Sequence, residues 1–145
     1  MTGAGAMGWV LAGAGLGGVF VRRAAGGGAA RERRVLALGL VVAAALYPAF
    51  VLTGVGGGPF LLEVAGVTAF AVPAWAGVVI SPVFLAVGWA AHVGWDVGLH
   101  LVGPAHGPGW YAALCIGFDL VVVAAVLARR GILLEQSTRA SVVTG

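Results

Sequence analysis

Apolar residues along the chain fall into five long runs, separated by charged residues, glycine clusters or proline. A helix satisfies its own backbone hydrogen bonds and needs about 20 residues to cross the hydrocarbon core of a bilayer, so each run predicts one membrane-spanning helix. The expected spans lie at roughly 4–21, 35–53, 60–80, 82–102 and 110–128. The predicted fold class is therefore all-α, a polytopic membrane helical bundle of about five transmembrane helices.

Composition supports a membrane location for the whole chain. Of the 145 residues, 61% are hydrophobic and only 9% are charged, which is far too apolar for a soluble domain of this length. Five spans and their connections would use nearly all of the chain, so we expect a single integral membrane domain over residues 1–145, surrounded by membrane lipid. The basic residues are all Arg, and most of them lie beside apolar runs. This distribution indicates membrane orientation rather than nucleic-acid binding.

The positions of the Arg residues predict the topology. Five of the eight lie in the segment RRAAGGGAARERR between the first two runs, and Arg129 and Arg130 directly follow the fifth run. Positively charged connections stay on the cytoplasmic side of a membrane, so both places should be cytoplasmic. Five crossings then put the N-terminus outside and the C-terminus in the cytoplasm of a multi-pass cell-membrane protein. The Arg-free connections GVGGGP and GPAHGPG would lie outside.

The fourth expected span carries three ionisable side chains. His92, Asp96 and His100 recur every four residues, and a helix turns by about 100° per residue, so they form one stripe along a helix face. Trp89 falls on the same stripe. Each ionisable side chain inside a span costs about 2.5–3.5 kcal/mol on insertion scales. The stripe therefore predicts a functional centre inside the bundle.

The fifth expected span carries a matching stripe, because Tyr111, Cys115 and Asp119 are also spaced by four residues. Two polar stripes on neighbouring helices should face a common interior. Glu63 lies near the outer start of the third span and Tyr47 in the outer half of the second. With the proposed topology, these side chains predict a polar column that opens to the extracytoplasmic side, with His106 in the connection above it.

The residue types of the column favour a metal-dependent enzyme. Imidazole and carboxylate groups are ligands for zinc and other divalent transition metals, and a metal with an open position can activate water. We expect the metal ligands, which are also the catalytic residues, to be His92, Asp96, His100 and Asp119. The substrate would be a lipid-like or isoprenoid molecule. The remaining residues expected to line the site are Glu63, Cys115, Tyr47, Trp89 and Tyr111.

Three other interpretations of the same residues remain open at this point. The His and Asp side chains could act as a general acid and base on a lipid or isoprenoid without a metal, with aromatic residues lining an apolar pocket. They could belong to a proton or ion conduit, or to a transporter subunit, working as an oligomer. They could also only hydrogen-bond one another and tie two helices together.

Two further segments carry weaker predictions. Gly13 and Gly17 have GxxxG spacing, which permits close approach to another helix of this chain or of a second copy in a homo-oligomer. The C-terminal segment ILLEQSTRASVVTG is mixed in character. We expect it to be a frayed or peripheral segment rather than a sixth span.

The block from Trp89 to Asp119 resembles a family of small polytopic membrane proteins of bacteria and fungi that share an HxxWD segment, a following His and a WYxxxC helix with a later Asp. The matching residues here are His92, Trp95, Asp96, His100, Trp110, Tyr111, Cys115 and Asp119. This resemblance covers about a fifth of the chain and implies a common polar centre without a defined reaction. A looser similarity to membrane hydrolases related to alkaline ceramidases implies zinc chemistry, although the expected site here contains no Ser.

Overall fold

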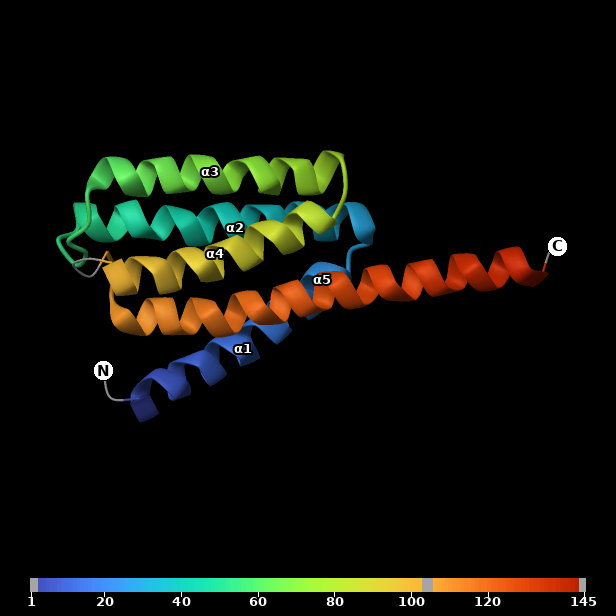
Figure 1. Ribbon diagram of the computed structural model, residues 1–145, viewed down its shortest axis with the longest axis horizontal. Coiled ribbons are helices and arrows are strands. Elements are labelled where there is room, and N and C mark those ends of the chain that lie inside the picture. Colours follow the sequence, from blue (N-terminus) through green and yellow to red (C-terminus); the bar gives the residue numbers. More distant parts are fainter. Residues whose placement is uncertain (1–2, 103–105, 144–145) are drawn as a thin grey trace.

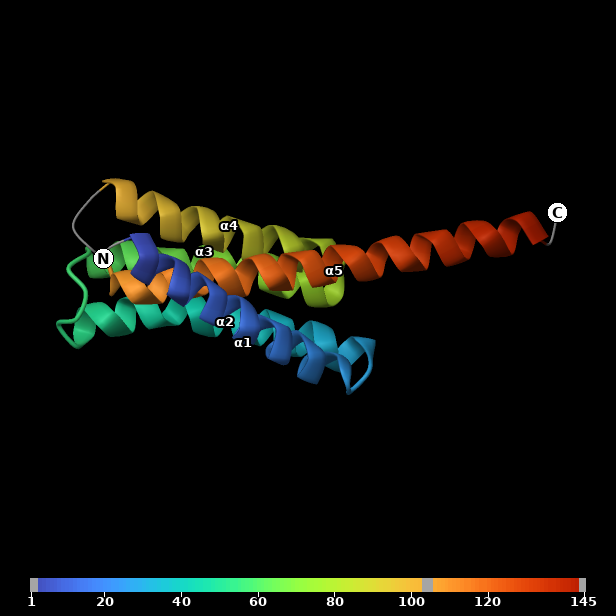
Figure 2. The same ribbon diagram turned by 90° about the horizontal axis from the view of Figure 1, so that it is seen from below.

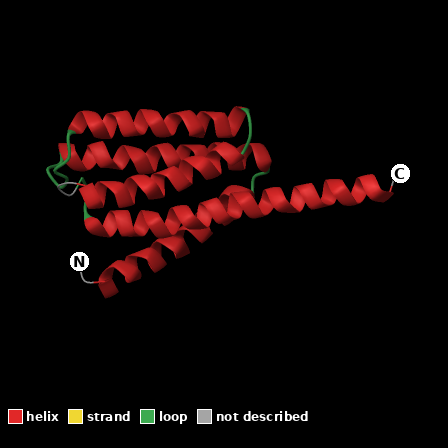
Figure 3. Ribbon diagram, viewed as in Figure 1, coloured by secondary structure: helices red, strands yellow, loops and turns green. Residues whose placement is uncertain are grey.

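The chain forms five α-helices and short connections over the residues that the structure describes (Figures 1 and 3). This structure is a computed structural model that describes the backbone of residues 3–102 and 106–143 and the side chains of residues 3–99 and 106–130. The predicted all-α class is confirmed. The helices are α1 (Gly3–Ala25), α2 (Ala29–Leu52), α3 (Phe60–Val79), α4 (Val83–Val102) and α5 (Gly109–Val143).

Four of the helices are long and apolar enough to cross a membrane. They are α1, α2, α3 and the Gly109–Arg130 part of α5, and the Val83–Leu99 part of α4 is a shorter apolar helix. Large apolar side chains project outward from the bundle, among them Leu61 and Leu11 with 80% and 66% of their surfaces exposed. Such apolar side chains are stable in contact with lipid, whereas their exposure to water would cost free energy. The protein is therefore a polytopic membrane protein.

Three helix ends differ from the sequence prediction, namely the end of α1, the start of α2 and the end of α5. The first connection contains only the residues between Ala25 and Ala29, so the Arg residues expected in a loop lie on helix ends. Long Arg side chains can reach the membrane surface from such positions, and the helix does not have to stop where the apolar run stops. In addition, α5 does not end near residue 128 but continues to Val143 and projects beyond the bundle (Figure 1). After Gly131 this segment contains no proline or glycine that would interrupt a helix before Gly145.

Helix α1 packs mainly against α5. Gly13 and Gly17 are buried there, and a Cβ atom at either position would collide with the backbone of Leu114 or Phe118. Gly117 makes the reciprocal close approach to Val10. The GxxxG spacing is therefore used between two helices of the same chain, and a homo-oligomer stays a prediction.

The bundle has two different ends (Figures 1 and 2). The connections α2–α3 and α4–α5 lie at one end with the beginning of α1, and we call this the loop end. The turns α1–α2 and α3–α4 lie at the other, which we call the arginine end because it carries the Arg residues of α1 and α2. Between them lies an apolar core whose most deeply buried members include Leu36, Leu40, Leu85, Trp89 and Val122.

Candidate functional site

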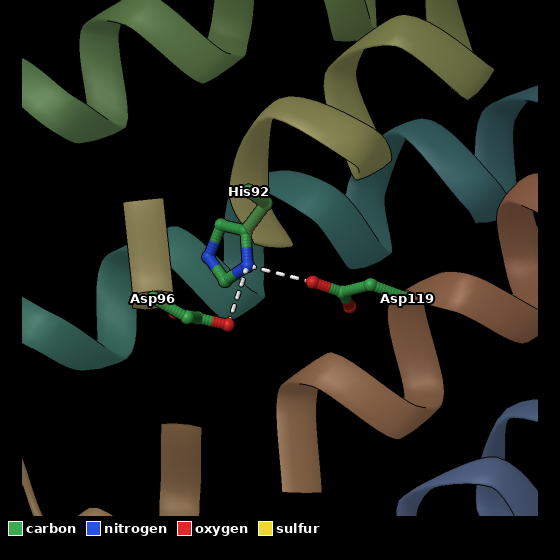
Figure 4. Close-up of side chains that lie close together, drawn as sticks. All are labelled: His92, Asp96 and Asp119. Atoms are coloured by element: carbon green, nitrogen blue, oxygen red, sulfur yellow. Dashed lines mark hydrogen bonds and ion pairs between the residues drawn. The ribbon is translucent and has the colours of Figure 1, made fainter. Parts of the chain in front are cut away.

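Three ionisable side chains meet in the middle of the bundle, between α4 and α5 (Figure 4). His92 and Asp96 are one turn apart on α4, and Asp119 reaches them from α5. The Nδ1 atom of His92 lies 2.9 Å from Oδ2 of Asp119 and 3.5 Å from Oδ2 of Asp96. None of the three has any exposed surface. We call these three residues the His92 cluster.

Helix α2 supplies a fourth member of this neighbourhood. The hydroxyl group of Tyr47 donates a hydrogen bond to Oδ1 of Asp96. Tyr111 on α5 donates a hydrogen bond of 2.9 Å to the carbonyl oxygen of Ala43. These two bonds join α2 to α4 and α5, and the bond from Tyr47 also fixes where Asp96 can lie.

His92 keeps one ring nitrogen away from the carboxylates. Figure 4 shows that Nε2 points away from both Asp96 and Asp119. This atom is buried and has no hydrogen-bond partner among the described residues, and the same is true of Oδ1 of Asp119. The ring packs edge-on against Phe70, with centroids 5.0 Å apart. Unpartnered polar atoms in an apolar interior are costly, so these two atoms are candidates for contact with a ligand.

A second pair of ionisable side chains lies at the loop end. Glu63, near the start of α3, pairs with His106 in the α4–α5 connection, and their Oε1 and Nδ1 atoms are 2.5 Å apart. Both residues are buried. Glu63 is thus not part of the His92 cluster, because its carboxylate is engaged by His106. In the structure these groups form the His92 cluster and, at the loop end, the Glu63–His106 pair, and a continuous polar column that contains both stays a prediction.

Gly58 makes the second pair possible. A Cβ atom at this position would collide with the imidazole of His106 and would lie 2.8 Å from the Glu63 carboxylate. Sequence reasoning placed His106 above the column without giving it a partner. The signal that could have identified the pair is the glycine-rich connection GVGGGP directly before α3, since such a stretch allows another part of the chain to approach closely.

The other predicted residues have different surroundings. Cys115 is buried with Tyr47 and Tyr111 in a small cluster on the loop-end side of His92. Trp89 belongs to the apolar core, where it packs on the rings of Phe20 and Phe118. His100 lies on α4, but its side chain falls outside the described side chains, so its role as a ligand stays a prediction.

The His92 cluster has the composition of a metal site. One nitrogen or oxygen ligand atom from each of its three residues lies within 4.8 Å of the others, and no other group of three His, Cys, Asp or Glu does so in the described part of the chain. Towards the arginine end lie Trp89, about one turn before His92 on α4, and the fully buried apolar side chains of Leu40, Leu85 and Val122. The cluster is therefore a closed polar centre inside an apolar bundle.

These features define the class of protein: a polytopic membrane protein with a buried His/Asp cluster. Comparisons of the chain with protein-family models, with curated proteins and with solved structures find no match. Its function must therefore be argued from the site.

Proposed function

We propose that this protein is an intramembrane metal-dependent enzyme that acts on a lipid-like or isoprenoid substrate. His92, Asp96 and Asp119 would bind Zn²⁺ or another divalent transition metal. The observation that carries the proposal is the meeting of three fully buried side chains of ligand type from two helices. Tethering alone would offset little of their insertion cost, because interhelical polar contacts are worth about 0.6–1.7 kcal/mol each.

Charge balance supports a bound cation. Two ionised carboxylates beside a neutral imidazole carry a total charge of −2, and buried charge without compensation costs several kcal/mol per ion. A divalent cation brings the total to zero. If His92 alone were protonated, the cluster would keep a charge of −1. A metal-free cluster would therefore need a second proton to become neutral.

The ligand spacing also suits a metal. Ligand atoms around a tetrahedral ion with bonds of about 2.0–2.2 Å lie roughly 3.2–3.6 Å apart. The His92–Asp96 distance of 3.5 Å falls in this range, and the His92–Asp119 distance of 2.9 Å would have to widen by a few tenths of an ångström. Three protein ligands leave one position for water or substrate, as in catalytic zinc sites. Tyr47 would orient Asp96 through its hydrogen bond.

The location of the cluster supports an apolar substrate. The cluster lies inside a bundle whose outer surface is covered by exposed apolar side chains, so a molecule dissolved in the bilayer can reach the protein laterally. On the loop-end side, Tyr47 and Tyr111 cover the cluster. We propose that these side chains move when substrate enters.

A metal-free acid–base enzyme is the second candidate. It is favoured by the 2.9 Å distance between His92 and Asp119, which is that of a hydrogen bond. In that arrangement, Nδ1 donates to Asp119, and Nε2 is left to exchange a proton with a substrate. An ion or proton conduit has less support, because the apolar layer of Leu40, Leu85 and Val122 offers no polar groups towards the arginine end.

Metal analysis of the detergent-purified protein tests the leading proposal. We expect about one zinc, iron or manganese ion per chain, either as purified or after incubation with each metal and removal of the excess. A His92→Ala variant should lose this metal. The matched control is His106→Ala, which removes an imidazole outside the His92 cluster and should keep it.

The result also separates the two candidate functions. Metal-free wild-type protein after all incubations would overturn the metal proposal and leave the acid–base enzyme. Equal metal loss in both variants would show that the metal is not bound by the His92 cluster. A positive result would lead to a comparison of membrane lipids from cells that produce wild-type protein or the Asp119→Asn variant, by mass spectrometry.

We also propose the orientation given by the Arg bias, with the arginine end in the cytoplasm and the loop end outside. Val55 in the α2–α3 connection has 59% of its surface exposed. A Val55→Cys substitution in a Cys115→Ala background should therefore react with a membrane-impermeant thiol reagent added to intact cells. Labelling only after the membrane is permeabilised would reverse the orientation.

A further inference from the structure

A pocket lies at the arginine end, far from the His92 cluster. It is formed where α2 begins, where α3 turns into α4, and along α5 beyond Val126. Asp119 and Arg129 are ten residues apart on the same helix, which corresponds to roughly 15 Å at a rise of about 1.5 Å per residue. The pocket has a volume of about 150 Å³, roughly ten times the 10–15 Å³ that one water molecule needs. It can therefore hold a polar group of several atoms.

The charged side chains that line the pocket are mostly basic. Three Arg side chains line it, namely Arg33 from α2 and Arg129 and Arg130 from α5. Glu32 is the acidic residue of the lining, and it pairs with Arg129. The three guanidinium groups and one carboxylate sum to a charge of +2, so the pocket attracts an anion. Guanidinium groups bind phosphate oxygens particularly well because they can donate two parallel hydrogen bonds.

The start of α2 strengthens this attraction. Ala29, the first residue of α2, lines the pocket, and the preceding Gly28 provides no side-chain cap for the first turn. The free backbone N–H groups and the helix dipole at such an end favour a negative charge. This feature adds to the Arg side chains, and it comes from backbone groups.

The floor of the pocket is apolar. Leu36, Leu85 and Val126 line it, and all three belong to the buried core of the bundle. Charged walls above an apolar floor, at the level where apolar spans end in Arg residues, match the boundary between lipid head groups and acyl chains. Basic pockets between transmembrane helices at this level bind the head groups of anionic lipids.

We propose that this pocket binds the phosphate group of an anionic membrane phospholipid. Arg33 and Arg130 contact the phosphate, and Arg129 is held beside it by Glu32. The site is separate from the His92 cluster and does not depend on the function proposed for that cluster.

Lipid titration of the detergent-purified protein tests this site. Phosphatidylglycerol and phosphatidylcholine with identical acyl chains are added separately, and bound lipid is measured by native mass spectrometry. We expect phosphatidylglycerol to bind more tightly. An Arg33→Gln/Arg130→Gln double variant should bind it about 30-fold more weakly, and Arg130→Gln alone about fivefold more weakly, from the usual effect of basic side chains near an anionic surface. The Arg130→Gln variant replaces an exposed side chain, so it tests the proposal if the double variant does not fold.

The matched control is an Arg22→Gln/Arg23→Gln variant. It removes the same charge from two exposed Arg residues at the end of α1, outside the pocket, and should bind phosphatidylglycerol within about twofold of wild type. Equal weakening by this control, unchanged binding in the pocket variants, or equally tight phosphatidylcholine binding would each overturn the proposal. Inorganic phosphate that displaced the lipid at similar concentrations would assign the pocket to free phosphate instead. Metal content should not change in the pocket variants.

Discussion

The His92 cluster and the Glu63–His106 pair are built from the same kinds of side chain but differ in charge balance. In the pair, one imidazole faces one carboxylate at 2.5 Å, so a single shared proton leaves no net charge. In the His92 cluster, one imidazole faces two carboxylates. The cluster therefore needs a further positive charge, and the pair does not.

The His92 cluster and the Glu63–His106 pair also differ in their positions in the bundle. Glu63 and His106 join the start of α3 to the connection before α5 at the loop end, where they can hold this connection against α3. The His92 cluster lies deeper, between long helices, and Tyr47 adds a bond from a third helix. The comparison suggests that the pair has a structural role and that the cluster has a chemical one.

The largest expected effect is a loss of metal when a carboxylate of the cluster becomes an amide. Asp119→Asn should lower the metal affinity by more than about 100-fold, because replacing a direct ligand should cost more than the 10–100-fold typical of an outer-shell partner. Glu63→Gln makes the same chemical change in the pair and should leave the metal content unchanged. Elemental analysis of both variants measures this, and equal losses would remove the distinction between the two sites.

A smaller loss of metal affinity is expected when only the hydrogen bond that supports Asp96 is removed. Tyr47→Phe deletes the hydroxyl group that donates to Asp96 and should weaken metal binding by about 10–100-fold. Tyr111→Phe is the control, since its hydroxyl group donates to the Ala43 carbonyl. Competition with a metal-binding indicator gives both affinities. A Tyr47→Phe affinity equal to that of wild type would exclude this supporting role.

The packing of α1 on α5 should affect stability without affecting the metal. Gly13→Ala would drive a Cβ into the Leu114 backbone and should cost about 1–3 kcal/mol in the free energy of unfolding. Gly15→Ala, on the same helix with open space around it, should be nearly neutral. Unfolding in a detergent titration measures both. Metal affinity per folded molecule should stay constant, because α1 contributes no residue to either site.

The smallest expected effect is the coupling within the pair. A double-mutant cycle with Glu63→Ala and His106→Ala should give a coupling of about 0.6–1.7 kcal/mol, the range found for polar contacts between helices in membranes. The same unfolding assay supplies the four stabilities. Zero coupling would show that the two side chains do not stabilise the loop end together. Loss of metal in the His106→Ala variant would instead connect the pair to the cluster.

The sequence predicted the helices and the positions of the polar residues along them. Apolar runs of about 20 residues were sufficient to predict an all-α membrane bundle, since backbone groups in lipid have few alternatives to a helix. Spacing by four residues put His92 and Asp96 on one face of α4, and it put Cys115 and Asp119 on one face of α5. These relations depend on helix geometry alone.

Helix ends were less predictable from the sequence. The boundary of an apolar run marks where lipid contact ends, whereas a helix can continue into the polar region as long as its residues permit. For this reason α5 extends well past Arg130, and the Arg residues around Gly28 lie on helices rather than in a loop.

Only the tertiary structure decided which polar groups meet. The sequence placed Glu63, Tyr47, His92 and Asp119 in one column without giving their partners, and the packing paired Glu63 with His106 and Tyr47 with Asp96. The reason is that helical periodicity fixes angles within a helix, whereas the rotation of one helix against another depends on side-chain packing along the whole interface. The close contact at Gly13 shows the same limit, because the GxxxG spacing permitted a close approach and only the packing selected α5 as the partner.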